Sequence, residues 1–571
     1  MEKPIERIQR TFIRLLFGIL LGLILLIGAI WGGHDLYVRW QEKRLVRRAT
    51  LDIQNGNERD ASLAARSILQ MKPSSASAAR IMAELAERLG ERAALDWRRK
   101  VVQSDPGSVD DALALVRCAV QFSDIVTAER TLAGVDESSR NSAPYHGASA
   151  SVAQFKHDDA KAEAEWTEAL RLKPDDKSFQ LQLGILRLRS NDPERRAAGE
   201  AMLVTVRSDP SQRSAATRAL INAGISRKED AHKLMELARE LQAYPEATWY
   251  DRFVYLDFLR GVQDPQFSSY LTELETTAPS KASSLAALLS WMAKNNLGLL
   301  AIDYSKSLPA ESLRNWPVPI ALADTYVRLR EWPNLETLTA KTNWGRFDFL
   351  RHAYLTRALR EQAKLAEAEH EWSAAVKDAT NSESLVLLIQ AISEWKWEAE
   401  STDLLWSLSK HREKQSEAFV ALYRTYAKAA DTQGLYRVLA RLSELDATNL
   451  DVQNNRAQVS LLLNANPTEA RRVAAEVYNK SPKNPAYVAT FAYSLLTQGN
   501  ANEAVRIMNS LNAEQLSEPT ISAYYGICLA ATGDEKARSY LDLGKQANLL
   551  PEEKVLIDKA YASLNSRSRS R

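Results

Sequence analysis

Cysteine is almost missing from this chain, which has only Cys118 and Cys528 among its 571 residues. The two residues lie far apart, each inside an apolar stretch with helical spacing. This scarcity excludes a disulfide framework of the kind that holds small secreted domains together. We predict that both thiols are small buried core residues rather than redox groups.

Catalytic motifs are missing as well. The seven histidines never stand four residues apart, which is the spacing that places two metal ligands on one helix face. His370 and Glu371 begin like a zinc-protease motif, but Ala374 stands where the second histidine is needed. The chain also has no glycine-rich phosphate loop, dinucleotide fingerprint or nucleophile elbow. We therefore predict a protein that is not an enzyme and that binds no cofactor and no metal.

A large excess of charge of either sign is missing too, because 74 Lys and Arg stand against 72 Asp and Glu. Nine of the basic residues and four of the acidic ones lie in the first 48 residues, so the rest of the chain is almost neutral. A nucleic-acid-binding surface needs a basic stripe that releases phosphate counterions. We therefore predict no nucleic-acid partner.

One long uncharged segment is present over residues 15–33, rich in Leu and Ile, with Trp31 and Tyr37 near one end. About 20 apolar residues span the hydrocarbon core of a bilayer, and aromatic rings favour its interfaces. The segment predicts a single transmembrane helix in the lipid bilayer. A cleavable signal peptide is the alternative, but its apolar core is usually about 7 to 15 residues long, and Ile27-Gly28-Ala29 is a poor cleavage site.

Basic residues flank this segment on both sides, so the positive-inside rule is nearly balanced. Arg14 abuts the segment, whereas Asp35 stands on its other side. This asymmetry favours residues 1–14 as a short cytoplasmic tail. Residues 34–48 are then a basic juxtamembrane linker on the opposite side of the membrane. Gly18 and Gly22 stand four residues apart and would let two such helices approach closely, which leaves homo-oligomerisation open.

The rest of the chain repeats with a period of about 34 residues. The repeat is clearest before Pro174, where small and apolar residues stand twelve, eight, five and four positions upstream. These offsets place the side chains on one helix face, and the proline ends the helix because it lacks an amide donor. Each set therefore predicts the second helix of a helical hairpin. Four sets show the pattern: Ala61, Ala65, Ile68 and Leu69; Ala162, Trp166, Ala169 and Leu170; Ala198, Met202, Thr205 and Val206; Ala470, Ala474, Val477 and Tyr478.

This pattern resembles the tetratricopeptide repeat, which has a small residue near the middle of each hairpin, alanines on the second helix and proline at its end. The resemblance covers most of the chain from about residue 45 and is weaker where Lys233 and Phe267 replace alanine. It implies an all-α fold, a right-handed α-solenoid of about 13 to 15 hairpins that follow the transmembrane helix. The glycines at or beside the turns are Gly56, Gly90, Gly499 and Gly533, and Ala492 and Gly526 match the small-residue contact of the first helix.

Prolines crowd together between Pro309 and Pro333, where the repeat is weakest. We place a boundary there, which divides the solenoid into residues 49–310 and 311–562. From Asn565 onward the chain has only polar and basic residues, so residues 563–571 are predicted to form a disordered basic tail.

Two candidate binding sites follow from the sequence. Arg218 and Asn222 resemble half of the carboxylate clamp with which some repeats of this family hold a peptide C-terminus, because a guanidinium and an amide suit a carboxylate. Eight of the thirteen tryptophans lie between Trp291 and Trp406. Among them, Trp395 and Trp397 stand two residues apart, and we expect one of the two to be exposed as an aromatic contact for a partner or a sugar ring.

The resemblance implies a membrane-anchored bacterial scaffold that binds other proteins or their peptide segments. We expect a single-pass protein of the inner (plasma) membrane whose repeat region lies in the periplasm and assists envelope assembly, secretion or surface-polysaccharide export. Two alternatives stay open. One is an adaptor that faces the cytoplasm and recruits a protease or synthase, and the other is a glycan-binding accessory factor of a polysaccharide machine. Fold alone does not decide among them.

Overall fold

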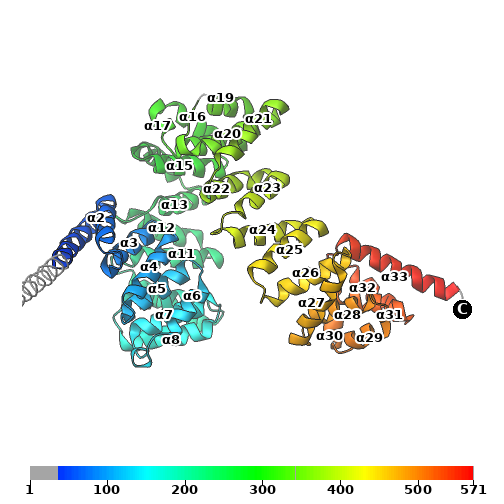
Figure 1. Ribbon diagram of the computed structural model, residues 1–571. Helices are drawn as coiled ribbons and strands as arrows, with labels where there is room; N and C mark the ends of the chain where they lie inside the picture. The colour runs from blue at the N-terminus through cyan, green and yellow to red at the C-terminus, as the bar shows by residue number, and fades with distance from the viewer. Residues whose placement is uncertain (1–35, 341, 570–571) are drawn as a thin grey trace, which may run out of the picture. The chain divides into compact units, whose positions relative to one another are not determined.

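The computed structural model describes residues 36–340 and 342–569, and these residues form helices joined by short turns (Figure 1). No strand occurs in this described part of the chain, which confirms the predicted all-α class. Residues 36–54 form the first described helix. The predicted transmembrane segment 15–33 lies outside the described residues. None of the helices that are described has the length and apolar character needed to cross a membrane.

The described residues form two compact units, one that ends at Glu273 and one that begins at Leu274. The predicted division at residues 310 and 311 falls inside the second unit and stays a prediction about how the hairpins there are grouped. The helices of unit 1 are α2 (Glu58–Met71), α3 (Ala76–Arg88), α4 (Ala93–Ser104), α5 (Val109–Gln121), α6 (Ile125–Ala133), α7 (Ala143–Phe155), α8 (Asp159–Leu172), α9 (Lys177–Leu188), α10 (Pro193–Val206), α11 (Arg213–Ser226), α12 (Ala231–Ala243), α13 (Trp249–Gly261) and most of α14 (Gln266–Thr277), with the 3-10 turn η1 (Glu137–Ser139).

Unit 2 continues the same alternation of helices and turns. Its elements are η2 (Ala278–Ser280), α15 (Ala282–Lys294), α16 (Gly298–Lys306), α17 (Ala310–Arg314), α18 (Val318–Leu329), α19 (Trp332–Ala340), η3 (Gly345–Phe347), α20 (Asp348–Glu361), α21 (Leu365–Asp378), α22 (Ser382–Ile392), η4 (Ser393–Trp395), α23 (Glu398–Leu408), α24 (Gln415–Lys428), α25 (Thr432–Leu445), α26 (Leu450–Leu462), α27 (Pro467–Lys480), α28 (Pro485–Leu496), α29 (Ala501–Met508), α30 (Ala513–Leu516), α31 (Pro519–Thr532), α32 (Ala537–Gly544) and α33 (Pro551–Arg569).

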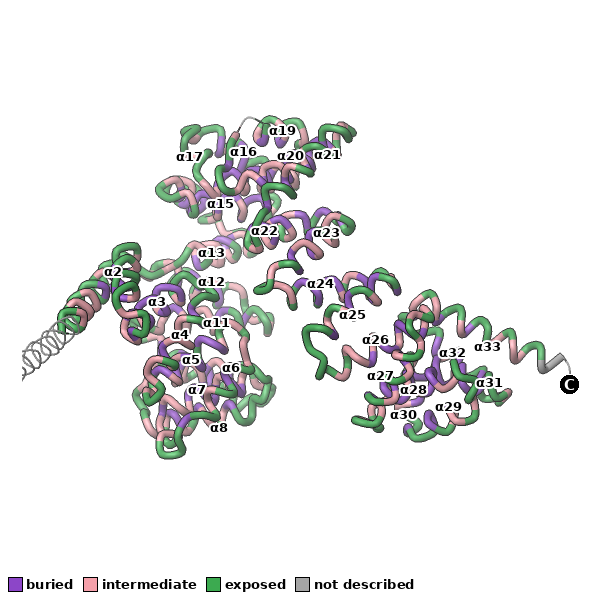
Figure 2. The backbone as a smooth tube through the Cα atoms, viewed as in Figure 1, coloured by how far each residue is buried: buried purple, intermediate pink, exposed green. Residues whose placement is uncertain are grey.

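Consecutive helices pack in pairs, as the hairpin pattern predicts. The buried residues lie along the helices, whereas the turns are mostly exposed (Figure 2). The pairs α7–α8, α9–α10, α20–α21 and α31–α32 are among those in closest contact. One hairpin cannot bury its apolar face alone, and within each unit neighbouring pairs pack against one another, as α8 does against α9 and α27 against α28.

The predicted second helices end where their prolines require. α2 stops at Met71 before Pro73, α8 at Leu172 before Pro174, and α27 at Lys480 before Pro482. In these three helices the predicted alanines are buried, and Leu69, Leu170 and Tyr478 at the margin of the face are half-buried. The repeat prediction is therefore confirmed for this part of the chain.

The set predicted before Pro210 is one residue out of register. Ala198 and Thr205 are exposed, whereas Gly199, Leu203 and Val206 are buried. A Cβ atom at Gly199 would lie 2.7 Å from the backbone nitrogen of Leu188. Because α10 approaches α9 this closely, only glycine fits at the contact, and the alanine beside it turns to solvent.

One residue with positive φ marks the turn of almost every hairpin. The predicted Gly56, Gly90, Gly499 and Gly533 have φ values of 77°, 68°, 81° and 83°. Other turns place a non-glycine residue there, including Ser123, His157, Lys228, Gln263, Asn296, Arg330, Ala363, Lys396, Ala430 and Asn464. Within the described helices, the α9–α10 hairpin is the exception, since no residue of its turn has a positive φ.

Cys118 and Cys528 are both buried and free, as expected. Burial raises the pKa of each thiol to about 12. The thiolate is therefore disfavoured near neutral pH, and neither residue has the low-pKa environment of a reactive cysteine.

Candidate functional site

The irregular α9–α10 hairpin borders a groove that we call the arginine groove. Its volume is about 670 Å³, and it lies entirely within unit 1, between α9, the turn that follows it and α11. Its lining contains four arginines and no acidic residue. The lining residues are Ile185, Leu188, Arg189, Ser190, Asn191, Arg196, Ala215, Arg218, Ala219, Asn222, Ala223, Ser226 and Arg227.

Local hydrogen bonds fix the α9–α10 turn. The hydroxyl of Ser190 accepts from the amide of Asp192 at 3.1 Å, and the Asp192 carboxylate accepts from the amide of Glu194 at 2.9 Å. This carboxylate caps α10, which then begins with Pro193, a residue suited to the first helical turn. Arg196 donates to the carbonyl of Ser190 at 3.3 Å, so its guanidinium is held beside the groove.

Arg218 forms the most ordered contact of the groove. Its Nε and Nη2 atoms donate to the two carboxylate oxygens of Asp251 on α13 at 2.6 and 2.7 Å, in a parallel bidentate pair. Asp251 is fully buried and also accepts from Thr248, which completes the capping box of α13. Burial alone raises the pKa of Asp251, yet the hydrogen bonds from Arg218 and Thr248 outweigh burial and hold this pKa below its ordinary value.

Arg227 is held in a similar way at the end of α11. It donates to Glu229 through Nε at 2.9 Å and Nη2 at 2.5 Å, and this contact lowers the pKa of Glu229. Two of the four arginines are therefore neutralised by carboxylates that stand outside the groove lining.

The other two arginines carry the net charge of the groove. Among the described residues, neither Arg189 nor Arg196 has a carboxylate within salt-bridge distance. Arg189 is exposed and Arg196 is half-buried. An arginine has five N–H donors, so Arg218 also keeps donors beyond the two that bind Asp251. The groove thus offers an excess of positive charge and several unused donors.

The floor of the arginine groove is apolar. Ile185 and Leu188 of α9 face the alanines of α11, namely Ala215, Ala219 and Ala223. The phosphate backbone of a nucleic acid would make few favourable contacts with such a floor. A peptide with acidic and aliphatic side chains could contact both the floor and the arginines. The chemistry of the groove therefore suits an acidic peptide segment.

Both predicted peptide-binding residues line this groove, where Asn222 is exposed and Arg218 is held by Asp251. Whether they bind a peptide stays a prediction. The sequence reasoning missed Arg189, Arg196 and Arg227, because they come from a turn and from the ends of helices rather than from one repeated face. The basic residues that cluster around the α9–α10 turn were the available signal.

The predicted aromatic contact has a different setting. Trp395 and Trp397 are 8% and 9% exposed, and their ring centroids lie 4.9 Å apart, so the expectation that one of them is exposed was wrong. η4 ends at Trp395 and the chain turns before α23, so the two rings do not diverge as they would on one helix. The guanidinium carbon of Arg360 lies 4.1 Å from the Trp397 ring centroid, and Arg360 is paired with Glu400.

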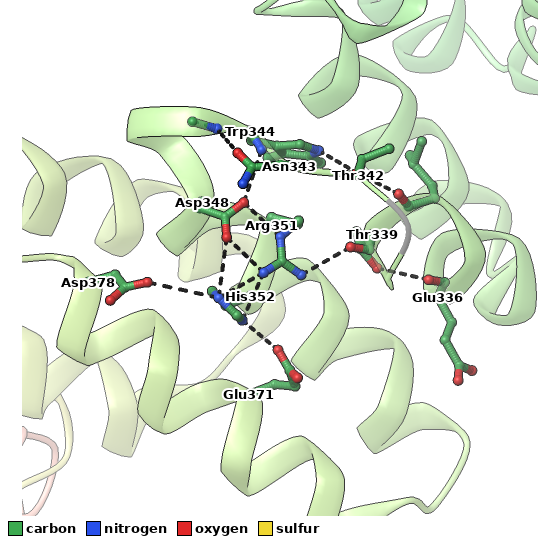
Figure 3. A network of polar contacts seen from close by, with 12 residues as sticks. Glu336, Thr339, Thr342, Asn343, Trp344, Asp348, Arg351, His352, Glu371 and Asp378 are labelled. Carbon is green, nitrogen blue, oxygen red and sulfur yellow. Dashed lines mark hydrogen bonds and ion pairs between the residues drawn. The ribbon is translucent and has the colours of Figure 1, made fainter. Parts of the chain in front are cut away.

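A polar network around His352 joins α20 to α21 (Figure 3). The Nδ1 atom of His352 lies 2.5 Å from Glu371, and Arg351 contacts Asp348 through Nε at 2.7 Å. No group of side chains in the described residues has the arrangement needed to hold a metal ion. We interpret the network as structural, since the α7–α8 hairpin repeats the histidine contact at the same sequence separation of 19 residues, between His146 and Glu165.

Comparisons with known proteins add little to this picture. No protein-family model matches the chain, and no curated protein matches its sequence. The crystal structure of the Cut9–Hcn1 hetero-tetramer of the APC/C is 14% identical, covers 80% of this chain and 96% of its own, and has a TM-score of 0.27. PilF of Pseudomonas aeruginosa is 17% identical, covers 44% of this chain and 95% of its own, and has a TM-score of 0.25. At these TM-scores the likeness carries no argument.

Proposed function

We propose that this protein is a membrane-anchored scaffold that binds acidic segments of partner proteins in the arginine groove. The observation that carries the proposal is the lining of the groove, which has four arginines, no acidic residue and an apolar floor. Repeated helical hairpins support the scaffold role, because they present long surfaces formed by successive first helices.

The location of this activity is part of the proposal. We infer from residues 15–33 that the chain is anchored in the inner membrane, with the hairpins in the periplasm. There the scaffold would serve envelope assembly, secretion or surface-polysaccharide export. In the opposite orientation the same groove would recruit a cytoplasmic protease or synthase, and only the orientation separates these roles.

The groove can be tested with a fluorescent peptide that alternates Glu and Leu, titrated against the full-length protein in lipid nanodiscs. Arg196→Ala should weaken binding by about tenfold, the effect of losing one charge-assisted hydrogen bond. Arg195→Ala is the matched control, because Arg195 is the neighbouring residue, lies outside the groove lining and pairs with Glu163 at 3.2 Å. Equal weakening by both variants, or no binding of the peptide at all, would refute the proposal.

A further inference from the structure

A second cavity lies within unit 2, and we call it the Trp316 cavity. Its volume is about 290 Å³, close to the lower limit of about 300 Å³ for small-molecule pockets, so it has room for one small ring. It is formed by the end of α15 and by α18, α20, α22 and η4. Its lining residues are Lys294, Trp316, Ile320, Asp324, Val327, Arg328, Leu350, Tyr354, Leu387, Gln390, Ala391, Glu394 and Trp395.

The half-buried carboxylate of Asp324 lines this cavity. Tyr354 is almost fully buried, and its hydroxyl donates to Asp324. Burial raises the pKa of Asp324, and the hydrogen bond from Tyr354 and the charge of Arg328 only partly oppose this effect. The carboxylate accepts one strong hydrogen bond from the protein and has lone pairs left for another donor.

Polar groups of both kinds surround Asp324 at the rim. Arg328 of α18 pairs with Glu394 of η4 at 3.2 Å, which links two sides of the cavity. Lys294 has no carboxylate within salt-bridge distance among the described residues, and Gln390 is exposed. The cavity therefore offers ammonium, guanidinium and amide donors beside carboxylate and amide acceptors.

Aromatic side chains form the rest of the wall. Trp316 is half-buried and stacks on Phe347, with ring centroids 3.8 Å apart and planes 9° apart. Trp395 packs edge-on against Tyr354 at 5.1 Å and presents only a small part of its ring. Since both tryptophans are fixed by aromatic neighbours, the wall is formed before any ligand arrives, which reduces the entropic cost of binding.

The charges of the lining decide which ligands fit. The lining has Lys294 and Arg328 against Asp324 and Glu394, so it carries no net charge, and a ligand of either sign would meet repulsion as well as attraction. A neutral ring with several hydroxyl groups meets no such repulsion. It can donate to the carboxylates, accept from Lys294 and Gln390, and place its C–H face against Trp316.

We propose that the Trp316 cavity binds a single neutral sugar ring, a hexose or N-acetylhexosamine unit, either free or at the end of a glycan. This site is separate from the arginine groove and does not depend on peptide binding there. It concerns Trp316 and Asp324 rather than the tryptophan pair that the sequence pointed to, although Trp395 takes part in the wall.

Saturation-transfer NMR on the full-length protein would test this site. The protein is held in nanodiscs rather than in detergent, because sugar-headed detergents would compete with the probe. D-glucose, D-galactose and N-acetyl-D-glucosamine are tested in turn, with agmatine as the cationic probe and glutamate as the anionic one. At least one sugar should bind saturably, and Gln390→Ala should weaken it by about fivefold through the loss of an amide contact. The control is Gln498→Ala, an exposed glutamine of the same unit that is remote in sequence and outside the cavity lining.

Asp324→Asn provides a second variant that keeps the shape of the side chain and an acceptor for Tyr354. It should weaken sugar binding while the circular dichroism spectrum and melting temperature stay close to those of the wild type. Three results would each overturn the proposal: no saturable sugar signal, a sugar signal that neither variant changes, or binding of agmatine in preference to every sugar.

Discussion

At the residue scale, the two kinds of arginine in the groove should have separable roles. Arg218→Ala would leave Asp251 buried without its cation, and we expect a loss of about 2 kcal/mol in unfolding free energy. Arg189→Ala should leave stability within about 0.5 kcal/mol, because its side chain is exposed and has no carboxylate partner among the described residues, yet it should weaken binding of the acidic peptide. Chemical denaturation of both variants gives the comparison, and equal stabilities would contradict the structural role of Arg218.

The same pair predicts a dependence on pH. The folded pKa of Asp251 lies below its unfolded value of about 3.9, so its contribution to stability is complete above that value and is lost as the pH falls through the folded pKa. The hydrogen bonds from Arg218 are the largest contribution that lowers this pKa, so their loss would raise the folded pKa of Asp251. The acid unfolding midpoint of Arg218→Ala should therefore lie at higher pH than that of the wild type, whereas Arg189→Ala should leave it unchanged.

The sequence could indicate Arg218 and Asn222 because their positions on one helix face resemble those of half a carboxylate clamp. It could not indicate Arg189 or Arg196, whose places depend on a turn that departs from the conformation of the other hairpins. Nor could it show that Trp395 and Trp397 are buried together, because the 3-10 turn before α23 interrupts the helix that the spacing assumed.

At the scale of the element, the hairpin turns combine a repeated conformation with a variable sequence. Gly499 has a φ of 81°, and a Cβ atom there would meet nothing within 4 Å. Gly261, at the end of α13, has equally open surroundings but no positive φ. Space is therefore matched between the two positions, and only backbone conformation differs.

Gly499→Ala should destabilise the protein by about 1 kcal/mol, because a left-handed conformation is strained for a residue with a Cβ. Gly261→Ala should be neutral or stabilise by up to about 1 kcal/mol, since alanine reduces the entropy of the unfolded chain. Thermal unfolding of both variants measures the difference. A melting temperature for Gly499→Ala at or above the wild-type value would show that the turn does not hold this conformation in solution.

The final helix, α33, is tied to hairpins far from it in sequence. The buried carboxylate of Glu553 accepts from Tyr524 at 2.5 Å, from Gln458 at 3.0 Å and from the amide of Leu550 at 2.8 Å. The neighbouring Glu552 accepts from Thr432 of α25 at 2.5 Å. α33 therefore contacts α25, α26 and α31. Its residues Ile557 and Ala560 are buried in the apolar core that α33 shares with α26 and α31.

Truncation before Pro551 should loosen these helices selectively. In a repeat protein each hairpin is stabilised by its neighbours, so loss of α33 should increase hydrogen exchange in α26 and α31 while α20 and α21 stay protected. A milder variant, Glu553→Gln, should show the same pattern with a smaller amplitude. Uniformly faster exchange across unit 2 would indicate that the unit unfolds as a whole and that α33 is not a local cap.

At the scale of the whole molecule, the hairpin architecture was the most predictable property. A period of about 34 residues repeats many times. A hairpin with a weak pattern can therefore still be assigned from the spacing of the hairpins on either side of it. The repeat prediction was out of register in α10, where Gly199 rather than Ala198 makes the helix contact. The missing Cβ of Gly199 lets α10 approach α9 closely. A single sequence does not reveal such local compensation, because the glycine that makes the contact stands beside an alanine that fits the repeat.

Attachment and orientation are the whole-molecule properties on which the proposed function depends. If residues 15–33 span the membrane once with the N-terminus inside, the repeat region and the C-terminus lie on the periplasmic side. Alkaline phosphatase fused after Arg571 should then be active in a bacterial host, and a green fluorescent protein fused there through the general secretion route should stay dark. Deletion of residues 1–33 should release the protein from the membrane fraction and abolish the phosphatase signal.

Crosslinking in intact cells, followed by mass spectrometry of the partners that copurify, then distinguishes the roles. Envelope or polysaccharide-export proteins with acidic segments should be recovered with the wild type and depleted with Arg196→Ala, while Arg195→Ala leaves the recovery unchanged. Recovery of cytoplasmic proteases or synthases, together with a fluorescent C-terminal fusion, would reverse the orientation and favour the adaptor. Both orientations leave the arginine groove intact, so peptide binding in nanodiscs is expected whichever side of the membrane the repeat region faces. The topology and the groove are therefore tested by separate measurements.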